Sequence, residues 1–292
     1  MLLRIHRYGS SNARTVVLVH GLTDAGTTWP DLVGHWGDDW HVLAPDLRGH
    51  GQSPRFTEDQ LGAAPEVLLA DVVTVLETQP EPVALVGHSL GGLLALRAAI
   101  ARPDRLWALV LEDPARPTAG RTPDPGFVAE IEEFLDAMAD PAGQVARMLQ
   151  ESSWSRAEIQ AWADCKPLVD RAYVRDGMYL GDDAWEELFD ALRVPTLLLV
   201  PPDSPMAPRQ AAVHNDLVRT VVVPGDGHCF CHDQPARYRR AVAAFFAEVP
   251  GPDRHGDEEA LLCSACQAPL TDELTVRPAW LMARVMARMP SY

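Results

Sequence analysis

The chain has 292 residues, with 25 lysines and arginines against 41 aspartates and glutamates, and so carries a formal net charge of −16. This length suits one large α/β domain or two small ones, and it is ample for a buried core. The acidic surplus would repel the phosphates of nucleic acids and of anionic lipids. We therefore expect neither nucleic acid nor a membrane as a partner.

The N-terminus begins with only three apolar residues before Arg4, whereas a signal peptide has an apolar core of roughly 7 to 15 residues. Nowhere does the sequence approach the roughly 20 apolar residues of a membrane-spanning helix. Its five cysteines, an odd number, fit a reducing compartment better than a disulfide framework. These features predict a cytoplasmic protein.

Short runs rich in Val, Leu and Ala recur along the chain, with helical stretches between them. The runs are continuously apolar rather than alternating, as in strands that are buried on both faces. They predict an α/β fold with a mostly parallel sheet flanked by helices. The runs span residues 15–21, 40–46, 82–88, 106–113, 195–203 and 219–228.

The strand pattern stops between residues 114 and 191, where helix-like segments with several aromatic residues predict a helical cap. Most of these aromatics would form the cap's own core, and some would line a pocket. A stretch rich in Pro, Gly and charge follows the last predicted helix and indicates a linker. We predict a core of residues 1–113 and 192–250, a cap at 114–191, and a C-terminal extension at 251–292.

One serine stands in a turn crowded with glycine. The sequence Gly87-His-Ser-Leu-Gly91 follows an apolar strand and precedes a helix, as in the nucleophile elbow Gly-x-Ser-x-Gly. Glycines two residues on either side of Ser89 remove side chains that would collide where strand and helix approach closely. The turn therefore predicts an exposed, activated Ser89 hydroxyl, and the alternative is an inert serine in a tight turn.

A nucleophilic serine needs a base, and the base needs an acid that holds its tautomer. His228 follows the last predicted strand on a Gly-rich loop, and we favour it over His232, which lies near the start of the final helix. Asp203 and Asp113 both satisfy the chain order serine, acid, histidine. We favour Asp203, because its strand directly precedes that of the histidine, and Asp113 stays the alternative acid.

The negative charge that forms during acyl transfer must also be held. The segment His20-Gly-Leu22 follows the first strong strand, and the backbone N–H of Leu22 could join that of Leu90 as an oxyanion hole. Losing one such donor typically costs ~3 kcal/mol of barrier, so a loop committed to this role is worthwhile.

Over residues 1 to about 250 the sequence resembles the α/β-hydrolase superfamily. The resemblance rests on His20-Gly21, on "DLRGHGQS" (46–53), on Gly-His-Ser-Leu-Gly-Gly (87–92), on "LVLEDPA" and on the His228 loop. It implies acyl transfer to water through a seryl ester, with no cofactor. The predicted cap over the site should favour a modest, largely apolar small-molecule substrate. Members often carry Gly-x-x-Asp after the strand that bears the acid, whereas "VPPDSPMAP" departs from this pattern and keeps Asp113 in play.

The extension is not explained by this resemblance. Cys263 and Cys266 have the spacing of half a zinc site, and structural zinc needs four ligands. Cys229 and Cys231 could complete the set, but metal there would compete with the base His228, so we expect no metal.

Two further functions stay open on the same residues. The fold could bind a small ligand with little or no turnover, or the same triad could perform C–C bond hydrolysis, a lyase step or perhydrolysis, because one fold hosts many reactions. We favour a serine hydrolase that cleaves an ester or a related small acyl compound.

Overall fold

The computed structural model describes residues 2–118, 120–202, 204–225, 227–249 and 251. Within these residues seven strands form one sheet in the order β1-β3-β2-β4-β5-β6-β7. The predicted α/β class and mostly parallel sheet are confirmed. The strands are β1 (Ile5–Tyr8), β2 (Arg14–Val19), β3 (Trp40–Pro45), β4 (Val83–His88), β5 (Leu106–Glu112), β6 (Thr196–Val200) and β7 (Val218–Val222).

The edge strand β1 was not predicted. It pairs antiparallel with β3, with Ile5 opposite Pro45, whereas every other pair in the sheet is parallel. Its four residues, Ile-His-Arg-Tyr, are mixed in polarity and only partly buried. A strand of this kind lacks the continuous apolar run by which the buried strands are recognised.

The central strands are apolar along their whole length because both faces of the sheet are covered. All residues of β4 and β5 are buried. Alternate side chains enter two separate cores: Val17 and Leu85 contribute to one, and Val16 and Val86 contribute to the other. Successive side chains of a strand therefore point to opposite faces of the sheet, although those on both faces are apolar.

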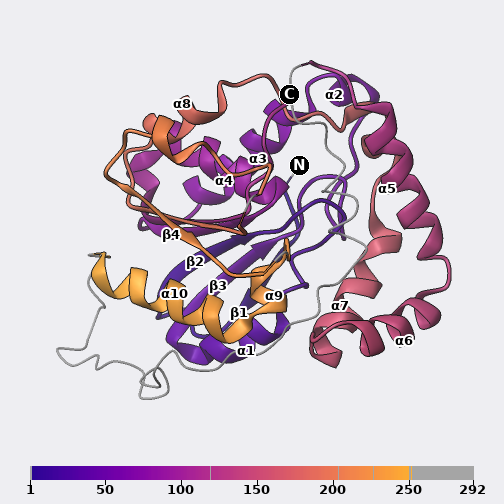
Figure 1. The fold of residues 1–292 in the computed structure, drawn as a ribbon, viewed down its shortest axis with the longest axis horizontal. Helices are drawn as coiled ribbons and strands as arrows, with labels where there is room; N and C mark the ends of the chain where they lie inside the picture. The colour runs from indigo at the N-terminus through magenta and orange to yellow at the C-terminus, as the bar shows by residue number, and fades with distance from the viewer. Residues whose placement is uncertain (1, 119, 203, 226, 250, 252–292) are drawn as a thin grey trace.

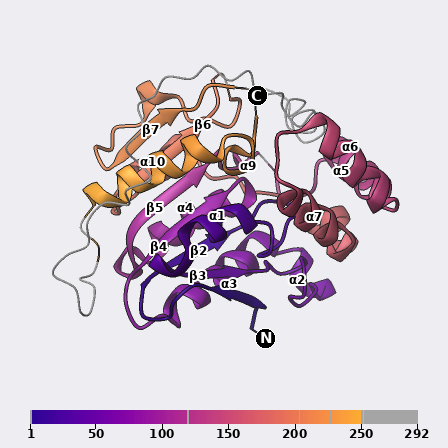
Figure 2. The same ribbon diagram turned by 90° about the horizontal axis from the view of Figure 1, so that it is seen from below.

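Two helical layers complete these cores (Figures 1 and 2). Helices α1 and α10 pack on one face, and α3, α4 and α8 pack on the other. The helices are α1 (Pro30–Trp36), α2 (Glu58–Leu61), α3 (Ala64–Glu77), α4 (Leu90–Ala101), α5 (Pro125–Ala137), α6 (Pro141–Glu151), α7 (Arg156–Cys165), α8 (Trp185–Asp190), α9 (Phe230–Asp233) and α10 (Pro235–Glu248).

Residues 114–191, which we call the cap segment, run between β5 and β6 and contain α5 to α8. Its first three helices begin at side-chain caps: Asp124, Asp140 and Ser155 each accept a hydrogen bond from a backbone N–H three residues on. Such caps satisfy donors that have no partner within the helix. Helices α5, α6 and α7 lie together at one side of the molecule (Figure 1). The division into domains stays a prediction.

In the part of the chain that the structure describes, no helix combines the length and the apolar character needed to cross a bilayer.

Candidate active site

Ser89 lies in the turn between β4 and α4 with a backbone φ of +52°, a region that non-glycine residues rarely adopt. A Cβ on Gly87 would lie 2.3 Å from the carbonyl oxygen of Gly91, and one on Gly91 would lie 2.2 Å from that of Val19. Both positions therefore require glycine. Glycine at these two positions lets the backbone segments approach more closely than any larger residue would allow.

The backbone of Ser89 is tied to the neighbouring strand. Its N–H donates to the carbonyl of Glu112 at 3.0 Å, and its own carbonyl accepts from the N–H of Ala115 at 2.9 Å. Both partners flank Asp113, the first residue after β5. Because β4 and β5 pair in parallel, Ser89 and Asp113 both lie at the carboxyl ends of these strands.

His228 is bound to Asp113. Its Nδ1 lies 2.6 Å from Oδ2 of Asp113, whose Oδ1 accepts from Oγ of Ser204 at 2.8 Å. Burial lowers the pKa of His228, but the hydrogen bond and charge of Asp113 outweigh it and raise that pKa above the ordinary value of 6.5. The carboxylate that contacts Nδ1 is therefore that of Asp113, which the sequence left as the alternative acid. Asp203, the acid favoured there, lies outside the described residues.

Two reactive atoms in this region have no hydrogen-bond partner among the described residues. Oγ of Ser89 and Nε2 of His228 are both buried and unpaired, and the two residues are only 2% and 6% exposed. The prediction of an exposed Ser89 hydroxyl is therefore wrong. Buried polar atoms are nearly always paired in folded proteins, so each exception needs an explanation, and a catalytic role is one. Catalytic hydrogen bonds are also often loose before substrate binds.

His88, which precedes Ser89 in the elbow, supports the loop that carries His228. Its Nε2 donates to the carbonyl oxygen of His228 at 3.1 Å, and the two rings are 4.7 Å apart. Burial and the neighbouring His228 hold the pKa of His88 well below 6.5. The ring is therefore neutral and keeps the Nε2 proton for this bond. Sequence reasoning assigned His88 only a structural place in the turn.

His232, the competing base, faces elsewhere. Its Nδ1 forms an ion pair with Oε2 of Glu158 at 2.8 Å. Burial lowers the pKa of His232, but Glu158 outweighs it and raises that pKa to about 9. A ring that is already protonated at neutral pH cannot take a proton from serine. The geometry thus favours His228 for that task.

The predicted oxyanion donors lie beside Ser89. A Cβ on Gly21 would lie 3.3 Å from Cβ of Ser89 and 2.9 Å from Nδ1 of His88, so the backbone that leads into Leu22 passes close to Ser89. Leu90 is the first residue of α4. Its N–H is one of the four at a helix start that lack an intrahelical partner. Leu90 follows Ser89 in the chain and Leu22 follows Gly21, which lies against Ser89; the oxyanion role of both residues stays a prediction.

Glu112 is a buried carboxylate that the sequence analysis did not single out. Its Oε1 accepts from the backbone N–H of Cys231 at 2.9 Å, and burial raises its pKa to about 7. It braces the segment that follows His228. The only sequence signal is an acidic residue at the end of an apolar strand.

Within the described residues, no group of three or more His, Cys, Asp or Glu side chains is arranged to hold a metal ion. Burial raises the pKa of Cys229 and Cys231 well above the ordinary value. Cys263 and Cys266 lie outside the described residues.

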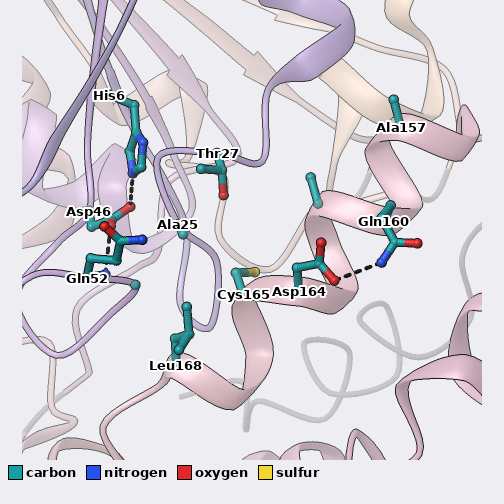
Figure 3. A pocket seen from close by; sticks show the side chains of 12 residues that line it. His6, Ala25, Thr27, Asp46, Gln52, Ala157, Gln160, Asp164, Cys165 and Leu168 are labelled. Carbon is teal, nitrogen blue, oxygen red and sulfur yellow. Dashed lines mark hydrogen bonds and ion pairs between the residues drawn. The ribbon is translucent and has the colours of Figure 1, made fainter.

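A surface crevice of about 480 Å³ runs along the seam between the core and α7 (Figure 3). Its core wall includes His6 and Asp46, which are hydrogen-bonded at 3.0 Å, and its α7 wall includes Gln160 and Asp164, bonded at 2.7 Å. None of Ser89, His228 and Asp113 lines it. The crevice is therefore separate from the candidate active site.

A mainly parallel sheet that presents a serine elbow, a histidine and a carboxylate at the ends of its strands is the arrangement of a hydrolase of the α/β class. The chain belongs to the alpha/beta hydrolase family, whose model matches residues 16–241. Membership fixes the family, and the small-molecule substrate expected from the sequence stays a prediction.

Individual relatives give the same picture. The chain is 37% identical over 173 residues to the lipase LipV of Mycobacterium tuberculosis, a match that covers 57% of this chain and 58% of the lipase. The chain thus spans less than two thirds of that relative. Two solved structures share the fold: a thermophilic esterase from Thermogutta terrifontis (TM-score 0.60, 24% identity, 84% and 93% of the two chains) and an enol-lactonase from Burkholderia xenovorans (TM-score 0.64, 20% identity, 84% and 96%).

Proposed function

We propose that the protein is a serine hydrolase that cleaves an ester or a related small acyl substrate through a seryl-acyl intermediate. Ser89 is the nucleophile, His228 the base and Asp113 the acid. The observation that carries the proposal is the 2.6 Å contact between Nδ1 of His228 and Asp113, with Nε2 of the same ring left unpaired in the region of an unpaired Ser89 hydroxyl. The name of the lipase to which the chain is similar denotes the same bond type.

The chemistry follows from proton positions. Asp113 accepts the Nδ1 proton of His228, which leaves Nε2 as the lone pair that receives the proton of Ser89. The serine oxygen then bonds to the acyl carbon, and the carbonyl electrons move onto its oxygen. His228 returns the proton to the departing alcohol as the ester bond breaks. Water repeats the sequence on the seryl ester and regenerates Ser89.

The oxyanion is held by the backbone N–H groups of Leu22 and Leu90. Both residues are buried, at 4% exposure, and buried dipoles act more strongly than the same groups in water. The N-terminus of α4 adds a favourable partial positive charge. A buried site of this kind suits a compact, largely apolar acyl group.

Hydrolysis of a short-chain p-nitrophenyl ester tests the proposal. The Ser89→Ala variant should lose nearly all turnover, because no other hydroxyl occupies the elbow. Thermal unfolding of the variant provides the matched control for folding. Unchanged turnover in a folded Ser89→Ala protein would rule out the mechanism.

The alternative is a protein that binds its ligand without turnover, and the same experiment must distinguish it from a hydrolase. If the wild-type chain binds small acyl compounds but hydrolyses none of them, across esters, lactones and amides of varied chain length, the protein is a binding protein on this fold.

A further inference from the structure

One lysine connects the cap segment to the loop that carries Leu22. Lys166 follows α7, and its side chain has no exposed surface. It is the only lysine in the sequence: 24 of the 25 basic residues are arginine. Its ammonium donates to the carboxylate of Asp24 and, at 3.2 Å, to the carbonyl oxygen of Thr23. A buried ammonium is costly unless such partners are kept.

The held loop is conformationally strained. Thr23 has a φ of +68°, which is unusual for any non-glycine residue and more so for a β-branched one. Its Oγ1 is buried and has no hydrogen-bond partner among the described residues. The thiol of Cys165 adds a 3.6 Å contact to the same Thr23 carbonyl. Strained residues persist where their surroundings fix them, and here those surroundings belong to the cap segment.

The strained residue adjoins the predicted oxyanion donor. Leu22 lies between Thr23, which Lys166 contacts, and Gly21, which packs against Ser89. Rotation of the backbone at Thr23 would therefore move the N–H of Leu22. A displacement of about 1 Å in such a group can cost about 100-fold in rate.

We propose that Lys166 is a positioning residue, which holds Thr23 and Asp24 so that the N–H of Leu22 points at the developing oxyanion. The inference rests on the proposed serine hydrolase function. The lysine comes from the cap segment and the loop comes from the core. Docking of the cap and completion of the oxyanion hole are then the same event.

The charges around Lys166 fit a permanent clamp. Burial raises the pKa of Asp24, but the Lys166 ammonium outweighs it and the net pKa is lowered. Burial likewise lowers the pKa of Lys166, and Asp24 outweighs it, so this pKa is raised. Nearby Cys165 has its pKa raised by burial to about 12 and stays neutral. The pair remains ionised at neutral pH, so Lys166 holds position and does not transfer protons.

Three variants test the clamp: Lys166→Met, Asp24→Asn and the double variant. Each single change leaves one buried group without its partner, so Tm should fall. The double variant removes both charges and should recover much of the Tm. Its kcat should nevertheless stay about 10- to 100-fold below wild type, with KM changed less than about threefold, because the Thr23 carbonyl loses the Lys166 ammonium and keeps only the longer contact with the Cys165 thiol. Recovery of kcat together with Tm would show a merely structural lysine and overturn the proposal.

Acetylation of Lys166 by an amine-selective ester provides a second readout, because no other lysine competes and the N-terminal amine is an internal reference. Linkage is reciprocal, so a phosphonyl group on Ser89, whose oxygen occupies the oxyanion hole, should slow Lys166 acetylation about tenfold. Equal rates with and without the group would overturn the clamp.

Failure of the proposed function is distinguishable from failure of the clamp. If a fluorophosphonate does not modify Ser89, the serine hydrolase function fails. The clamp is then tested by acetylation of Lys166 in Asp24→Asn against wild type. A rate at least about tenfold faster in the variant supports it, since the loop then opens more often. An unchanged rate contradicts it.

Discussion

Two buried imidazole–carboxylate pairs lie four residues apart in the sequence and differ in what surrounds them. His228 contacts Asp113 at 2.6 Å, and His232 contacts Glu158 at 2.8 Å. The first pair lies within the core, where Asp113 directly follows β5 and Nε2 of the imidazole has no hydrogen-bond partner among the described residues. The second joins α9 of the core to α7 of the cap segment, and the ring of Trp154 packs 4.5 Å from His232.

A buried imidazole–carboxylate pair can therefore be reactive or structural, depending on what surrounds it. Nε2 of His228 is unpaired, so the ring can take and return a proton. His232 is enclosed by Trp154 and by Glu158, which also accepts from the backbone N–H of Asp31 in α1 at 2.9 Å. A protonated His232 therefore acts as a permanent link between the cap segment and the core.

Substitution of the two histidines should have very different effects on turnover. His228→Gln should lower turnover of a p-nitrophenyl ester by at least about 10⁴-fold, because the serine loses its base. His232→Gln should keep turnover within about tenfold, since that ring does not exchange protons in the reaction. Steady-state kinetics on folded proteins measure both. Equal losses in the two variants would erase the distinction between the pairs.

The second prediction concerns the acid on His228. Asp113→Asn should reduce kcat by about 10³- to 10⁴-fold, because the amide no longer fixes the productive tautomer of the ring. Asp203→Asn is the matched control and should stay within about tenfold of wild type. A larger loss for Asp203→Asn would return the role of the acid to the residue that sequence order favours.

The third prediction concerns stability. Breaking a buried ion pair typically costs about 3–5 kcal/mol, so His232→Gln should lower the free energy of unfolding by an amount of this order at pH 6. The pKa of His232 is raised from 6.5 to about 9 in the folded state. Its stabilisation is therefore complete below pH 6.5 and is lost as the pH rises through about 9. Urea denaturation across this range should show the gap between the two proteins narrowing; a constant gap would contradict the charged pair.

The smallest expected effect is a shift in the pH profile. The acid limb of kcat/KM reports the base of the free enzyme, and Asp113 raises the pKa of His228 above 6.5. Wild type should lose activity as the pH falls through a value above 6.5. The residual activity of Asp113→Asn should fall at a lower pH. If the acid limb stayed at the same pH in Asp113→Asn, Asp113 would not be the group that raises the pKa of His228.

Much of the fold follows from the sequence because buried parallel strands must be apolar throughout, as β4 and β5 are. The short edge strand β1 escapes this rule. Ser89 is recognisable because only glycine fits at positions 87 and 91. The acid is harder to choose, because chain order permits both Asp113 and Asp203, and the turn that aims Asp113 has a φ of +37° that composition does not reveal.

Contacts between the cap segment and the core are the least predictable part. Lys166 and Glu158 lie in helical stretches where a charged residue usually faces solvent. Their burial depends on how α7 meets the loop at Thr23 and the start of α1. Those partners are more than 120 residues away in the chain, so local patterns carry no trace of them.

Mass mapping after reaction with a fluorophosphonate is the most direct test of the central claim. We predict one phosphonyl group per chain on Ser89 in wild type, greatly slowed labelling in His228→Gln, and no group at this position in Ser89→Ala. Ester hydrolysis that continues while Ser89 stays unmodified, or modification at another residue, would contradict a seryl nucleophile activated by His228.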